Sequence, residues 1–402
     1  MKKIFIYITL HFLFFLTVSG QEQKVKPDES RKVGGATKSG IIKTECQGFV
    51  NSPGTDLKWR PILTHKTTSL RPKVPDKELI EKIKSEKLKT KYLKSNADTT
   101  DEKSTMTITP VVGTSYMANT SNGSSPLDNS LAISNGGWIV SVANKTIEYD
   151  DMNGNTVYYN DLISFINDAS ITGVCDPVVI YDAAADRFIF FCQTSPITSN
   201  SKILLFFSKT NNPNNGWWYY KLTGNPLDDD EGFDYPKLAV STNELYVTGN
   251  LFYEPAGTFD QAILYQINKN NGYSGSTLHW QYWYDISGSP FTLLPVSYGQ
   301  SGSYGPGCYL VSTIHSGSSK IKFYNLTDDM SGNPSLDHYN VSTPSYSSAA
   351  NSWQFGTTCK LDNGDCRALS GFYLNGIIHF VFHSDIGNGW NGINYNWIMV
   401  SI

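Results

Sequence analysis

Three aspartates could form an acidic site if the chain folds as repeated β-sheets. Asp128, Asp176 and Asp234 each stand just before, or at the start of, an apolar segment that reads as the first strand of a repeat. Glycosidases that use two carboxyl groups need one as acid and one as base or nucleophile. A glycoside hydrolase with Asp176 and Asp234 on the axis, with Asp128 nearby, is therefore our alternative hypothesis. Against it, aspartate before a strand commonly serves as a turn residue, and no acid stands near Phe291 in the fourth repeat.

A second acidic segment suggests a metal. The stretch NPLDDDEGFDYP (225–236) holds five carboxylates within seven residues. Calcium takes six to eight oxygen ligands with tolerant geometry, so we predict a calcium site at Asp228, Asp230 and Asp234. The alternative is a solvated acidic loop, and the spacing does not match an EF-hand. No other cofactor is expected.

Aromatic side chains offer a surface for ligands. Phe, Trp and Tyr make up 13% of the chain, and flat faces of Trp and Tyr can stack on sugars or anchor a protein. We predict Trp217, Trp283 and Trp390 as ligand-binding residues. Packing between sheets is the competing explanation for most of these rings.

The strands that must position these residues come from a repeat. A strand, a polar turn and a second strand recur, followed each time by a third strand and in some units by a fourth. The first two strands of each unit span residues 131–144, 178–193, 237–252, 293–313 and 369–384. Radially repeated four-stranded antiparallel units are propeller blades. The sequence therefore predicts an all-β protein with a β-propeller of about five visible blades over residues 111–402.

The ring of blades could be completed in two ways. The fifth unit ends within its third strand, on the apolar run IMVSI. Residues 105–109 (TMTIT) could supply the missing outer strand, or the chain could be truncated from a larger propeller. We favour truncation.

The segments before the repeats differ in character. Residues 1–20 have a basic start, an apolar run and small residues at the end, which predicts a secretory signal peptide. Residues 21–110 hold 19 Lys and Arg against 12 Asp and Glu, and we expect a Lys-rich linker or propeptide that is mostly irregular. Helical spacing of apolar residues predicts one helix near 76–94. No second apolar run is long enough to span a membrane.

Several segments resemble a known group of proteins. CDPVVIYDAAADRFIFF (175–191), GFDYPKLAVSTNELYVTGNLF (232–252) and LNGIIHFVFHSDIGNGWNGINYNW (374–397) are similar to segments of large secreted β-propeller proteins of Bacteroidota-type bacteria. The resemblance covers roughly residues 125–402. It implies the propeller fold and implies no particular activity. The group is sialidase-like in shape only.

Residue counts exclude two functions. Sialidases need three arginines to hold the substrate carboxylate, whereas residues 111–402 contain only Arg187 and Arg367. The same residues hold 11 Lys and Arg against 24 Asp and Glu, and this negative charge repels nucleic acids. We therefore expect a secreted or cell-surface binding protein, without catalytic activity, whose partner is a glycan or a protein.

The six cysteines complete the set of candidates. An even number in an exported chain favours disulfides. If a hairpin turns near Ala184, Cys175 faces Cys192, and a tight turn at KLDNGD would place Cys359 opposite Cys366. We predict these two disulfides, with Cys46–Cys308 by default.

Overall fold

The computed structural model describes residues 24–25, 32–50, 72–95, 115–116, 119, 126–194, 198–300, 302, 304–354, 358–387 and 389–400. The expected signal peptide, residues 105–109 and most of residues 96–125 lie outside this set. Over the described part of the chain, no helix combines the length and the apolar character that crossing a membrane requires.

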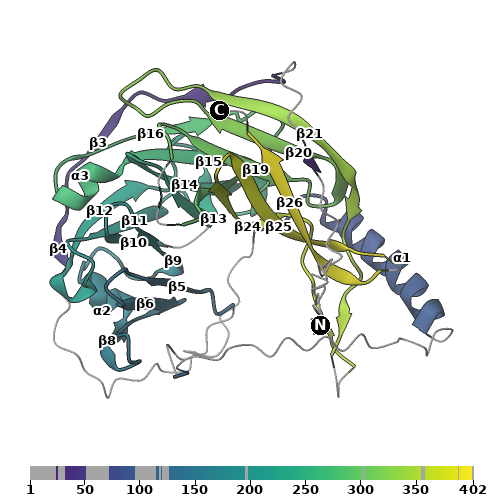
Figure 1. Cartoon of the computed structure of the whole chain (residues 1–402), viewed down its shortest axis with the longest axis horizontal. Coiled ribbons are helices and arrows are strands. Elements are labelled where there is room, and N and C mark those ends of the chain that lie inside the picture. Colours follow the sequence, from purple (N-terminus) through teal and green to yellow (C-terminus); the bar gives the residue numbers. More distant parts are fainter. Residues whose placement is uncertain are drawn as a thin grey trace, which may run out of the picture.

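The body consists of antiparallel sheets built from consecutive strands, which confirms the propeller prediction. Figure 1 shows these blades side by side in an arc that is open between the first and the fifth. Blade 1 contains β5 (Asn129–Ile133), β6 (Ile139–Ala143), β7 (Thr146–Asp150) and β8 (Thr156–Asp161). Blade 2 contains β9 (Cys175–Asp182), β10 (Arg187–Gln193), β11 (Lys202–Ser208) and β12 (Trp217–Thr223). Blade 3 contains β13 (Glu231–Val240), β14 (Glu244–Tyr253), β15 (Thr258–Asn268) and β16 (Leu278–Tyr284).

The last two blades are less regular. Blade 4 contains β17 (Leu294–Pro295), β19 (Cys308–Thr313), β20 (Gly317–Leu326) and β21 (Leu336–Ser347). Blade 5 contains β24 (Ala368–Leu374), β25 (Ile377–Asp385) and β26 (Asn391–Met399), with β18 (Ser297–Tyr298) parallel to β24 on its inner side. A two-stranded ribbon, β22 (Ser352–Trp353) and β23 (Lys360–Leu361), lies between the two blades in the sequence.

Apolar side chains are buried between successive blades rather than in one central core. One face of β10 packs Phe188 and Phe190 against blade 1, and the other packs Ile189 and Phe191 against blade 3. Similar clusters join blades 3 and 4, and blades 4 and 5. A strand covered on both faces needs apolar residues at nearly every position, which explains the unbroken run FIFFC in β10.

The N-terminal residues form a strap along the outer edges of the blades. β1 (Lys24–Val25) pairs with β26, Gly34 pairs with His338 of β21, and β2 (Thr37–Lys38) and β3 (Ile42–Thr44) pair with β16. β4 (Gly48–Val50) pairs with β12. The strap (24–25 and 32–50) therefore gives four blades an additional partner at their outer edge, where unpaired backbone groups would otherwise be exposed. The expectation of a mostly irregular segment did not foresee these short strands, because their backbone bonds to sheets distant in sequence.

Three helices complete the described fold, with a short 3-10 turn at Pro213–Asn215. The expected helix is present as α1 (Lys77–Ser95), and α2 (Leu162–Ile166) and α3 (Lys269–Ser274) are short connectors. α1 buries Ile80 and Lys84, and its lysines form ion pairs with Asp362 and Asp385 near blade 5. Figure 1 shows α1 beside β24–β26.

Candidate functional site

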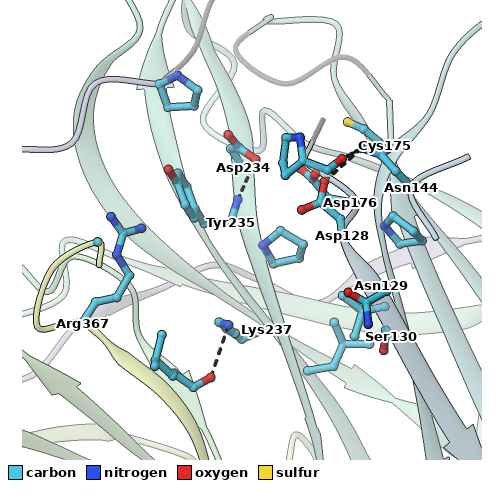
Figure 2. Close-up of a pocket in the computed structure, with 18 of the residues that line it drawn as sticks. Asp128, Asn129, Ser130, Asn144, Cys175, Asp176, Asp234, Tyr235, Lys237 and Arg367 are labelled. Carbon is cyan, nitrogen blue, oxygen red and sulfur yellow. Dashed lines mark hydrogen bonds between the residues drawn. The ribbon is translucent and has the colours of Figure 1, made fainter. Parts of the chain in front are cut away.

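The three aspartates predicted as axial carboxyl groups meet in the structure. Asp128 directly precedes β5, Asp176 is the second residue of β9, and Asp234 lies in β13. These are the innermost strands of blades 1, 2 and 3. Because the blades are arranged around a centre, the ends of these strands lie close together. Figure 2 shows Asp128, Asp176 and Asp234 on one side of a pocket. We name these residues the carboxyl cluster.

The backbone at each aspartate is unusual. Asp128 and Asp176 adopt φ values of 46° and 50°, and Tyr235, next to Asp234, adopts 60°. This left-handed region disfavours residues other than glycine, although aspartate tolerates it better than most. Ladder irregularities lie between Asp234 and Lys237 and between Phe191 and Gln193. Strained positions of this kind concentrate at functional sites, and three of them adjoin this one cluster.

Amide groups hold the cluster together. The Gln193 side-chain amide donates to Asp176 Oδ2 at 2.7 Å and to Asp234 Oδ1 at 3.0 Å. The Asn144 amide donates to Asp128 Oδ2 at 2.9 Å. Both other aspartates lie close enough to Asp176 to raise its pKa. Asp176 is therefore the centre of the cluster, with Asp128 and Asp234 flanking it.

Proximity and burial keep protons on the cluster. Burial, followed by the charge of Asp234, raises the pKa of Asp176 to about 9. Burial is also the main cause that raises the pKa of Asp128 and of Asp234. Carboxyl groups this close together cannot all ionise at once, so they share protons at neutral pH.

The cluster faces a cavity of about 1500 Å³. Its walls come from the inner strands of the blades, from Pro72–Val74 and from the first turns of α1. Six basic residues line the same cavity: Lys73, Lys77, Lys84, Lys145, Lys237 and Arg367. Figure 2 shows Lys237 and Arg367 apart from Asp128 and Asp176. Sequence reasoning missed Lys237, Arg367 and Gln193 as site residues. Arg367 carried one signal, because it is one of two arginines in residues 111–402.

Two of the three predicted ligand-binding tryptophans are buried, so these predictions were wrong. Trp217 is 0% exposed and donates to the Tyr149 hydroxyl, and Trp283 is 2% exposed and donates to Gln266. Both pack between blades, where large rings fill the space between sheets. Trp390 is 53% exposed and does not line the cavity.

The predicted calcium site is not assembled. Asp228 and Asp230 are exposed, whereas Asp234 is buried in the carboxyl cluster. Among the described residues, no group of three or more His, Cys, Asp or Glu side chains is arranged to hold a metal ion. The prediction failed because Asp234 belongs to a strand that leads inwards, while Asp228 and Asp230 remain in the turn before it.

The structure contains no disulfide among the six cysteines, all of which it describes. The expected register of the first hairpin was wrong, because Cys175 faces Gln193 and Val178 faces Phe191. A shift by one residue turns a side chain to the opposite face, and Cys192 packs in the core between blades 1 and 2.

The other predicted cysteine pairs are also not formed. Lys360, next to Cys359, pairs with Trp353 of β22 rather than with the strand after Cys366. Cys46 donates to the Gly48 carbonyl, and Cys308 is buried beside Tyr304. The structure therefore contains neither the predicted Cys359–Cys366 hairpin disulfide nor the Cys46–Cys308 pair.

Comparisons with known proteins show distant likenesses in fold. No family model matches the chain, and no curated protein matches it. The α-L-arabinanase of Cellvibrio cellulosa, solved with arabinohexaose, is 14% identical, with 67% of this chain and 90% of that chain covered and a TM-score of 0.30. A protein of unknown function from Bacteroides caccae is 12% identical, with 68% and 86% covered and a TM-score of 0.32. The subtype N11 neuraminidase-like protein of A/flat-faced bat/Peru/033/2010 (H18N11) is 10% identical, with 66% of this chain and 71% of that chain covered and a TM-score of 0.35. These likenesses are too distant to assign an activity.

Proposed function

We propose that this protein is a secreted, non-catalytic glycan-binding propeller, and that its ligand occupies the cavity against the carboxyl cluster. The observation that supports this is the convergence of Asp128, Asp176 and Asp234 on one wall of a cavity of about 1500 Å³. Typical pockets for small molecules measure about 300–1,000 Å³. The larger space here suits an oligosaccharide.

The chemistry of the cluster suits sugar hydroxyl groups. A carboxylate oxygen accepts hydrogen bonds, and a protonated carboxyl group also donates one. Three carboxyl groups that share protons therefore offer donors and acceptors side by side, as neighbouring hydroxyl groups on a sugar ring require.

Glycoside hydrolysis is the second candidate, and one observation favours it. Asp176, with a pKa of about 9, keeps its proton at neutral pH, as a general acid must. The state of the other two carboxyl groups favours binding, however. A glycosidase needs an ionised base or nucleophile beside its acid, whereas burial raises the pKa of Asp128 and of Asp234 as well.

A binding assay combined with a product assay tests the proposal. Purified protein is applied to an array of plant and microbial oligosaccharides, and the same sugars are incubated with it and analysed for new reducing ends. We expect binding without products, and loss of binding in Asp176→Asn. The matched control is Asp230→Asn, because Asp230 is exposed in the turn before blade 3 and should leave binding unchanged.

Two results would contradict the proposal. New reducing ends that disappear in Asp176→Asn would establish the hydrolase instead. If no saccharide binds, or if Asp176→Asn binds as tightly as the unaltered protein, the carboxyl cluster is not a glycan site.

A further inference from the structure

We infer that the ligand of the cavity is an acidic saccharide, whose carboxylate or sulfate group binds at Lys237 and Arg367. This inference rests on the proposed glycan-binding function. It adds to that function a chemical class of ligand and a second contact region, which we name the basic pair.

The basic pair lies within the same cavity as the carboxyl cluster. Lys237 follows Asp234 by three residues on β13, beyond the irregularity in that strand. Arg367 directly precedes β24 of blade 5, so the two cations come from different blades. Figure 2 shows both side chains lining the pocket. One ligand that spans the cavity could therefore contact both the cluster and the pair.

Arg367 is held in a fixed orientation. Its Nε donates to Asp365 Oδ1 at 2.8 Å, and its Nη2 donates to Asp365 Oδ2 at 2.6 Å. The guanidinium also lies over the rings of Tyr235 and Phe291, 4.8 Å and 4.7 Å from their centres. One carboxylate therefore balances the charge of Arg367, and the aromatic rings fix the plane of its donors.

Lys237 has no such counter-charge. Its Nζ lies 3.4 Å from the Leu369 carbonyl oxygen, and no ion pair within the described residues includes it. Burial, followed by the charge of Arg367, lowers the pKa of Lys237. By contrast, the buried Lys269 amine contacts Asp182 at 2.6 Å. Lys237 is a partly desolvated cation near a second cation, and an anion would stabilise it.

The two regions together select the ligand. A carboxylate or sulfate would meet one net positive charge at the basic pair, while hydroxyl groups would meet the carboxyl cluster. Retained protons on the cluster limit its repulsion of an acidic sugar, because Asp176 is neutral at pH 7. A uronic acid and a sulfated sugar share this chemistry.

Calorimetric titration with matched saccharides tests the inference. The probes are an oligogalacturonate, its methyl ester, a neutral galactan oligomer and a sulfated galactan oligomer. We expect the oligogalacturonate or the sulfated oligomer to bind at least about tenfold more tightly than the neutral probes, a factor typical of a hydrogen bond to a charged group. Whichever acidic probe binds more tightly identifies the anionic group.

The variant Lys237→Gln should remove this preference, so that acidic and neutral probes bind with similar affinity. Lys237→Arg keeps the charge and should retain the preference. Lys320→Gln is the control, because Lys320 is exposed on β20. Melting temperatures of all variants verify that they fold, and Lys237→Gln should melt no lower than the unaltered protein because it removes an unpaired charge.

The outcomes separate this inference from the proposed function. Equal binding of acidic and neutral probes, unaffected by Lys237→Gln, would overturn the inference and leave the glycan site in place. Binding of no probe would overturn both.

Discussion

Two regions of this molecule remove carboxyl groups from water in different ways. Asp182 at the end of β9 is 2% exposed and accepts hydrogen bonds from the Lys269 amine at 2.6 Å and the Tyr273 hydroxyl at 2.9 Å. Asp176, at the other end of the same strand, accepts a hydrogen bond from a glutamine amide and lies near two further aspartates, which raise its pKa. The first is covered by α3 and the neighbouring blade, and the second faces the cavity.

The difference separates a structural role from a functional one. A buried carboxylate is tolerated when a cation and hydrogen bonds compensate it, as at Asp182. Carboxyl groups placed against one another destabilise the fold to some degree, because their protons must be retained. Such an arrangement beside a cavity indicates a ligand site, and the predictions below test the contrast between the two regions.

The largest expected effect is at the structural pair. Replacing Lys269 by Met leaves Asp182 buried without its counter-charge, and breaking such a pair costs about 3–5 kcal/mol. Urea denaturation should measure this loss in the free energy of unfolding, with Lys320→Met as an exposed control near zero. A loss below about 1 kcal/mol, the usual value of a surface pair, would show that the pair is not structural.

The carboxyl cluster should respond to pH in the opposite sense from an ordinary salt-bridged aspartate. The native state keeps the Asp176 proton up to its pKa of about 9, whereas the unfolded chain releases it near the ordinary value of 3.8. The stability from this proton is fully present below pH 3.8 and is lost as pH rises to about 9. Asp176→Asn removes this dependence. The variant should therefore gain stability relative to the unaltered protein as pH rises from 4 to 9, by thermal unfolding across that range. A difference that does not change with pH would contradict the shared-proton description.

The smallest effect is expected at Glu231, which is buried at the start of β13 and does not line the cavity. Burial, followed by Asp260 and Asp229, raises the pKa of Glu231 to about 9, so it is uncharged at pH 7. Glu231→Gln should therefore change the free energy of unfolding by less than about 1 kcal/mol and leave saccharide binding intact. A larger loss at pH 7 would mean that the carboxylate is ionised and bound to a cation.

The fold was accessible from the sequence, and part of the site was as well. The recurrence of strand–turn–strand units and the polar residues of their turns located the blades. The position of Asp176 before a strand was sufficient to propose a carboxyl site. Burial was not accessible, because Trp217 and Trp390 are both rings near turns and only packing between blades distinguishes them. Strand pairing between segments distant in the sequence could not be predicted either. The strap bonds to outer strands more than a hundred residues away, and Lys237 and Arg367 share a cavity only through the arc of blades.

The most direct test of the account is a crystal structure of the protein with a bound oligogalacturonate. We predict a sugar in the cavity, with a hydroxyl group on Asp176 and the carboxylate within hydrogen-bond distance of Lys237. A sugar bound only on the outside of the blades, for example against Trp390, with none in the cavity, would contradict the claim that the cavity is the glycan site.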